Sequence, residues 1–159
     1  MKFILTITLL FSSLFVNKNP DTNYLIDFKC FKGNVFSASK EITFIGGIKS
    51  RFTPTRQEIE QVENLVSKLI PQEKQAKANF GKKCPKISKN LNKYNRQYVG
   101  YIDSDGNRII WINFIWKKDC PANWEKDIIL NTDGCSYFWQ VKINLKEKKF
   151  FDLYVNGIA

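Results

Sequence analysis

The chain has 159 residues, a net charge of +10 and no histidine. This length fits one domain, and a composition with 13 Phe, 6 Tyr and 4 Trp predicts a packed aromatic core and excludes a disordered chain. Without histidine, the chain has no Ser-His-Asp or Cys-His nucleophile, no His-ligated metal site and no imidazole general base. We therefore expect that the protein is not an enzyme and that it binds no cofactor.

An apolar N-terminal segment is the first predicted element. Lys2 precedes an apolar run over residues 3–16, and Pro20 follows soon after it. The run is shorter than a helix that spans a bilayer and is typical of the hydrophobic region of an export signal. We predict a signal peptide over residues 1–17, one domain over residues 18–159, a secreted or periplasmic location, and no transmembrane segment after removal of the signal.

Two strand-like segments, residues 23–31 and 41–45, precede the clearest predicted helix. Thr55 and Glu58 have the spacing of a capping box, in which each side chain accepts a backbone N–H at the start of a helix. Apolar residues then recur at helical spacing up to residue 70, and Pro71 ends the helix because proline lacks an N–H. The sequence predicts one amphipathic helix with a single apolar face.

From residue 94 onward, apolar and polar residues alternate in a way that predicts antiparallel strands. The segments 94–103, 108–117, 135–145 and 151–155 are separated by turn-forming residues. The segment 108–117 is apolar on both faces, so we expect it to be central and covered on both sides. Consecutive strands are expected to be neighbours. The predicted fold class is α+β, with one main helix packed on a meandering antiparallel sheet.

Four cysteines follow the signal: Cys30, Cys84, Cys120 and Cys135. An even number in an exported chain indicates two disulfides. We favour a Cys120–Cys135 bond, since these two residues flank one short loop between strand-like segments, and Cys30–Cys84 then remains. Four free thiols are the alternative. A metal site is not expected, because the chain has no C-x-x-C pair and no histidine.

The positive charge is concentrated between residues 72 and 96, which hold seven Lys, one Arg and one Glu. Such a stretch can bind an acidic protein or an anionic component of the cell envelope, or it can be a solvated face. Nucleic acid is not expected, because lysines without clustered arginine give no base-specific contact. Two tryptophans near Cys120 are a second candidate, with burial in the core as the alternative. The candidate binding residues are Lys82, Lys83, Lys86, Lys89, Lys93, Arg96, Trp116 and Trp124.

Five segments resemble a group of small exported bacterial proteins of unassigned function: residues 51–56, 95–101, 109–113, 141–145 and 151–157. This resemblance implies a genuine domain and no particular mechanism.

The order of elements is also similar to that of cystatins: Gly46 and Gly47 precede one helix, and the segment from Gln97 to Gly100 that follows resembles the Gln-x-Val-x-Gly motif of the family. This similarity implies a cystatin-like roll and an inhibitory role for Gly46 or Gly47 together with Gln97 and Val99. The chain departs from the family pattern, because Gly100 comes one residue early. It also has no Pro-Trp pair.

We therefore expect a non-catalytic, exported binding module of the cell envelope or exterior. One alternative is a cystatin-like peptidase inhibitor. The other is a small carboxylate-dependent enzyme, which requires four aspartates to converge in one pocket: Asp103, Asp105, Asp127 and Asp133.

Overall fold

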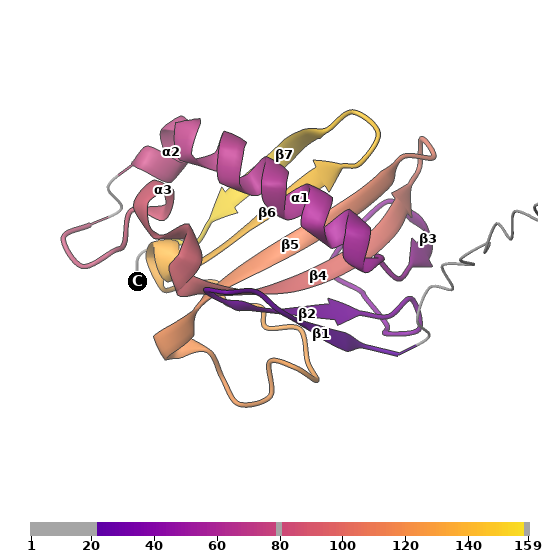
Figure 1. The fold of residues 1–159 in the computed structure, drawn as a ribbon, viewed down its shortest axis with the longest axis horizontal. Coiled ribbons are helices and arrows are strands. Elements are labelled where there is room, and N and C mark those ends of the chain that lie inside the picture. The colour runs from indigo at the N-terminus through magenta and orange to yellow at the C-terminus, as the bar shows by residue number, and fades with distance from the viewer. Residues whose placement is uncertain (1–21, 79–80, 158–159) are drawn as a thin grey trace, which may run out of the picture.

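A computed structural model describes residues 22–78 and 81–157, so the predicted signal peptide lies outside the described residues. One sheet of seven mostly antiparallel strands carries a single long helix on one face (Figure 1). The predicted α+β class is confirmed. The strands are β1 (Tyr24–Asp27), β2 (Lys32–Phe36), β3 (Ile48–Phe52), β4 (Tyr94–Asp103), β5 (Arg108–Trp116), β6 (Phe138–Asn144) and β7 (Lys149–Val155). The helices are α1 (Arg56–Leu69), α2 (Lys74–Lys77) and α3 (Ile87–Asn90), with 3-10 turns at Ile70–Gln72, Leu91–Lys93, Lys117–Asp119 and Cys135–Tyr137.

Helix α1 begins and ends where its sequence signals predict. The Thr55 hydroxyl accepts the backbone N–H of Glu58 at 3.2 Å, and the Glu58 carboxylate accepts the backbone N–H of Thr55 at 2.8 Å. These bonds form the predicted capping box, and Pro71 lies in the 3-10 turn that follows the helix. The buried residues Ile59, Val62 and Val66 lie on the face of the helix that packs against the sheet.

Strand β4 organises the sheet, because three strands pair with it. Strand β5 pairs along its whole length on one side, whereas β2 and β3 share the other side. Strand β2 runs parallel to the first half of β4, and β3 runs antiparallel to the second half. A Cβ at Gly100 would lie 2.6 Å from the carbonyl oxygen of Phe52, so glycine is required where β3 approaches β4.

Strands β4 to β7 pair in chain order, as predicted, and β1 pairs with β2, but β2 and β3 do not pair with each other. Strand β2 pairs with β4 instead of β3, and residues 41–45 form no strand. Their apolar side chains cover the face of the sheet opposite α1, which we call the second face. There, Phe44 packs against Trp111 with ring centroids 5.0 Å apart. Burial against Trp111 accounts for the apolar residues that had suggested a strand.

The long loop of residues 120–134 covers the rest of the second face and is held by three buried side-chain amides. Gln97 donates to the carbonyls of Trp124 (2.6 Å) and Asp127 (2.7 Å). Asn113, its partner across β4 and β5, donates to the carbonyl of Ile129 at 2.7 Å. Asn34 donates to the carbonyl of Glu125 at 2.9 Å. Strand β5 is therefore covered on both faces, as its sequence predicts.

Replacing Asn34 with Ala is expected to lower the free energy of unfolding by about 1–2 kcal/mol, because a carbonyl of the loop loses its donor. Tryptic cleavage at Lys126 should also become faster, since the loop is less firmly held. Urea denaturation and timed proteolysis measure the two effects. The matched control is Asn92→Ala, at an exposed position. An equal loss of unfolding free energy in both variants would show that the Asn34 amide does not hold the loop in place.

Candidate functional site

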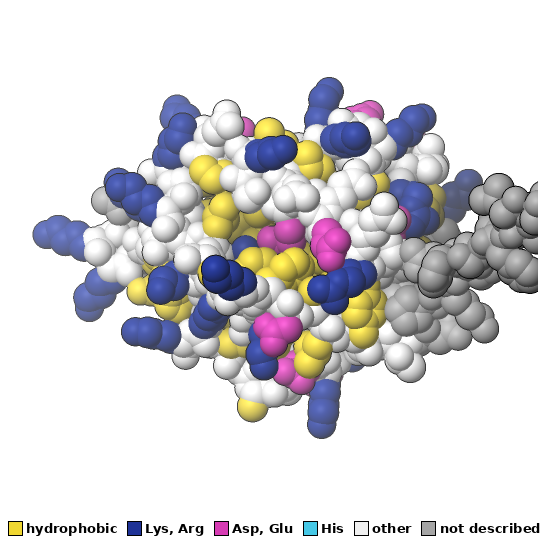
Figure 2. Space-filling view, viewed as in Figure 1, with side chains coloured by type: hydrophobic (Ala, Val, Ile, Leu, Met, Phe, Trp, Pro, Cys, Tyr) yellow, Lys and Arg dark blue, Asp and Glu magenta, His cyan; other side chains and the backbone are white. Residues whose placement is uncertain are grey.

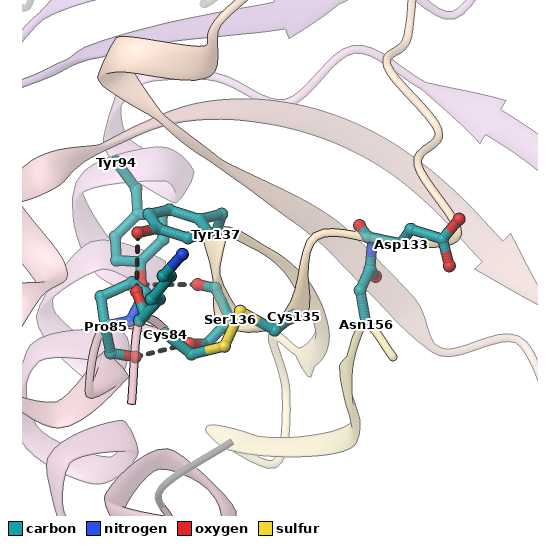
Figure 3. The surroundings of a disulfide bond; sticks show 9 residues. Cys84, Pro85, Tyr94, Asp133, Cys135, Ser136, Tyr137 and Asn156 are labelled. Atoms are coloured by element: carbon teal, nitrogen blue, oxygen red, sulfur yellow. Dashed lines mark hydrogen bonds between the residues drawn. A yellow bond between two sulfur atoms is a disulfide. The ribbon is translucent and has the colours of Figure 1, made fainter. Parts of the chain in front are cut away.

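The disulfide joins Cys84 to Cys135, so both predicted pairings were wrong. Cys120 and Cys135 are close in sequence, but the loop between them crosses the second face. Cys120 comes to lie beside Asn95 of β4, whereas the backbone N–H of Cys135 donates to the carbonyl of Gly157 after β7. The bond to Cys84 spans 51 residues of sequence. It attaches the lysine-rich segment to the 3-10 turn that precedes β6 (Figure 3).

Three hydrogen bonds reinforce this attachment (Figure 3). The Tyr94 hydroxyl donates to the carbonyl of Ser136 at 2.7 Å, and the Ser136 hydroxyl donates to the carbonyl of Pro85 at 2.5 Å. The Tyr137 hydroxyl donates to the carbonyl of Lys83 at 2.7 Å. Burial raises the pKa of Tyr94, which stays neutral and keeps its donor proton. The backbone of the lysine-rich segment is thereby fixed against Tyr137.

Tyr137 also lines a hollow of about 550 Å³. Trp116 forms part of its wall, with its ring centroid 5.5 Å from that of Tyr137 and 5.0 Å from that of Tyr94. We call it the aromatic hollow. Its lining residues are Trp116, Lys118, Asp119, Gly134, Tyr137 and Phe138. Aromatic walls with a few charged groups at the rim are typical of ligand sites.

Five of the predicted lysines are exposed, and we call them the basic end: Lys82, Lys83, Lys86, Lys89 and Lys93. Figure 2 shows dark blue side chains gathered at the end of the molecule that carries α2 and α3 in Figure 1. The contact between Tyr137 and Lys83 connects the basic end to the aromatic hollow. The structure thus brings Trp116 together with the lysine segment, two candidates that the sequence presented separately.

Arg96 and Trp124 do not belong to this surface. Arg96 is 1% exposed, and its guanidinium lies between the rings of Phe31 (3.4 Å) and Phe114 (4.9 Å). Trp124 is 7% exposed, and its backbone is held on the second face. Since Trp116 packs on the helix side of the sheet, the two tryptophans do not form one binding pair.

Tyr137 and Phe138 are the site residues that sequence reasoning missed. They lie two and three residues after Cys135, but only the correct disulfide partner reveals that this segment lies beside the lysines.

The four aspartates considered for catalysis lie in two separate segments, the β4–β5 turn and the loop of residues 120–134, and Asp133 in that loop is exposed. Asp103 accepts the side-chain and backbone N–H groups of Asn107 within the β4–β5 turn, and Asp105 is exposed in the same turn. Asp127 is paired with Lys40 at 3.3 Å. Hydrogen bonds from Asn123 and Lys40 lower the pKa of Asp127, which therefore stays ionised. Among residues 22–78 and 81–157, no three His, Cys, Asp or Glu side chains are grouped as metal ligands.

Of the residues suggested by the cystatin similarity, Gly46 and Gly47 are exposed in the loop before β3, but the two strand residues are not at a surface tip. Gln97 and Val99 are buried in β4, and the turn at the end of that strand is formed by residues 104–107. Gln97 uses its amide to hold the loop on the second face. Its side chain is therefore not available to a peptidase in this conformation.

In the described part of the chain, no helix has the length and apolarity needed to cross a membrane. No protein-family model matches the sequence, and comparison with curated proteins and with solved structures found no match. Function must therefore be inferred from the geometry of the aromatic hollow and the basic end.

Proposed function

We propose that this protein is a non-catalytic binding module, exported to the cell envelope or exterior, that captures an acidic saccharide at its basic end. The observation that supports this function is the contact between Tyr137 and Lys83, which places an aromatic wall directly beside a cluster of positive charge. Trp116 presents a flat ring for a sugar face, and the lysines present ammonium groups for carboxylates or phosphates.

The lysines and the hollow contribute differently to such binding. Exposed lysines attract an anion over a distance of about 8 Å at physiological ionic strength, so this part of the affinity should fall as salt is added. Contact with the rings of Trp116 and Tyr137 depends on apolar area and should persist in salt. Lys118, which also lines the hollow, adds a positive charge to it.

Reversing the charge of Lys82, Lys83, Lys86 and Lys89 to Glu is expected to weaken binding of polygalacturonate about tenfold at physiological salt, equivalent to about 1.4 kcal/mol. The control reverses Lys49, Lys68, Lys146 and Lys149, which are exposed elsewhere on the molecule. Because the two variants have the same net charge, a difference between their affinities for polygalacturonate can arise only from a localised site. Titration of each variant with labelled polygalacturonate gives the two dissociation constants.

Three further measurements separate the possible outcomes. Trp116→Ala should weaken the binding that remains at high salt, and neutral dextran should not bind. An equal loss of affinity for polygalacturonate in the two charge-reversed variants would reject a binding site at the basic end. Preference for polyglutamate over polygalacturonate would reject the saccharide and indicate an acidic protein partner.

A further inference from the structure

The two cysteines outside the disulfide lie in segments that are linked by one side chain, Asn95. The Asn95 carbonyl oxygen accepts the backbone N–H of Lys32 at 3.2 Å, two residues after Cys30. The Asn95 side-chain N–H₂ group lies 3.7 Å from the sulfur of Cys120. A single amide therefore connects the end of the Cys30 turn to the Cys120 thiol.

Lys117 provides a second link between the same two segments. Its ammonium group donates to the backbone carbonyl of Cys30, and it lies three residues before Cys120. Cys30, Asn95 and Lys117 line one shallow hollow of about 360 Å³ at the edge of the sheet. Cys30 is exposed and Cys120 is half-buried, and both sulfurs are free thiols.

We propose that Cys30 and Cys120 form a second disulfide, exchangeable with small thiols, when the protein meets a disulfide donor outside the reducing cytosol. The proposal does not depend on the saccharide-binding function. It requires a local shift of the exposed turn of residues 28–31, which is closed by one backbone hydrogen bond from Phe28 to Phe31. The donor is a disulfide, either glutathione disulfide or the disulfide of an exchange protein.

The exposure of the two sulfurs sets the order of the exchange. The Cys30 thiolate attacks one sulfur of the donor, so that a mixed disulfide forms and one donor thiolate leaves. The Cys120 thiolate then attacks the Cys30 sulfur and releases the second donor thiolate. The two protein thiols give up two electrons and two protons in total, and the donor is reduced to two thiols. Desolvation raises the pKa of Cys120, which fits the slower, resolving role.

The second disulfide would also hold in place the aromatic ring that covers the buried guanidinium of Arg96. Phe31 is the residue after Cys30, and its ring lies on the guanidinium of Arg96 at 3.4 Å. Phe28 stacks on Phe31 with ring centroids 4.5 Å apart. A bond from Cys30 to Cys120 would therefore attach the β1–β2 turn, with Phe31, to the segment after β5.

Peptide mapping of the full chain after incubation with glutathione disulfide tests the proposal. Each cysteine lies in a different tryptic peptide, so every pairing is distinguishable. We expect a Cys30–Cys120 linked peptide beside the Cys84–Cys135 one, and the two reactive thiols of the reduced pair should disappear. Persistence of both thiols in the folded protein would overturn the proposal, as would Cys30 found linked only to glutathione or to a second chain.

Single variants test the order of attack. In Cys120→Ser, glutathione should remain attached to Cys30, because no thiol resolves the mixed disulfide. In Cys30→Ser, glutathione should reach Cys120 about tenfold more slowly, because that sulfur is half-buried. Equal rates in the two variants would overturn the assigned order. In the oxidised wild-type chain, a rising concentration of reductant should open Cys30–Cys120 before Cys84–Cys135, whose Cys135 is buried.

Discussion

Replacing Glu63 with Ala is expected to lower the free energy of unfolding by about 3–5 kcal/mol, as is typical when one partner of a buried ion pair is removed. A carboxylate oxygen of Glu63 lies 3.4 Å from the Nε of Arg96 and accepts the Tyr98 hydroxyl at 2.8 Å. Burial, followed by the charge of Glu63, holds the pKa of Tyr98 well above its usual value, so Tyr98 is a neutral donor. The Ala variant leaves a buried cation without its anion. Urea denaturation measures the loss.

Two companion variants separate this buried pair from an ordinary surface charge. Glu60 is on the same helix and pairs with Arg56, but its side chain is 51% exposed, so Glu60→Ala should cost less than about 1 kcal/mol. Combining Glu63→Ala with Arg96→Met should recover much of the stability, because neither charge then remains buried alone. A Glu63→Ala variant as stable as Glu60→Ala would contradict the importance of the pair.

The position of Arg96 shows where charge patterning misleads. It is the last positive residue of the basic stretch, and a count of charge places it with the lysines. The alternation of β4 places it on the face that carries Tyr94 and Tyr98, which is the face covered by α1. A charged residue on such a face requires a partner, and Glu63 on the polar side of the predicted helix supplies it.

Local signals predicted the elements that form locally. The capping box of Thr55 and the turn after Asp103 are each set by a few neighbouring residues, and both occur as expected. The alternation from residue 94 onward gave strands β4 to β7 in their correct order. These features need no information about distant segments.

Features that depend on the path of the chain could not be predicted in the same way. The parallel pairing of β2 with β4 joins segments separated by about 60 residues, with no short turn to indicate it. The role of Gln97 depends on a loop that begins more than 20 residues later. The Cys84–Cys135 bond follows from the same loop, because its crossing of the second face separates Cys120 from Cys135.

Removing the disulfide by Cys84→Ser with Cys135→Ser is expected to lower the free energy of unfolding by about 4 kcal/mol. The bond closes a loop over a sequence separation of 51 residues, and the entropy that it removes from the unfolded chain grows with the logarithm of that length. The hydrogen bonds from Ser136 and Tyr137 to the same segment contribute only about 1 kcal/mol each, so they cannot replace it. Chemical denaturation of the variant and the parent measures the difference.

The same double variant also separates stability from binding. At a temperature where the variant is still folded, Lys82 and Lys83 would be held mainly by the Tyr137 contact, so polygalacturonate should bind more weakly than to the parent. Full reduction of the disulfide in the parent protein should reproduce both the lower stability and the weaker binding. This measurement controls for effects of the serine side chains. An unchanged unfolding midpoint would show that the bond adds nothing to the fold. Unchanged affinity together with a lower midpoint would show that ligand capture does not need the lysines fixed beside the aromatic hollow.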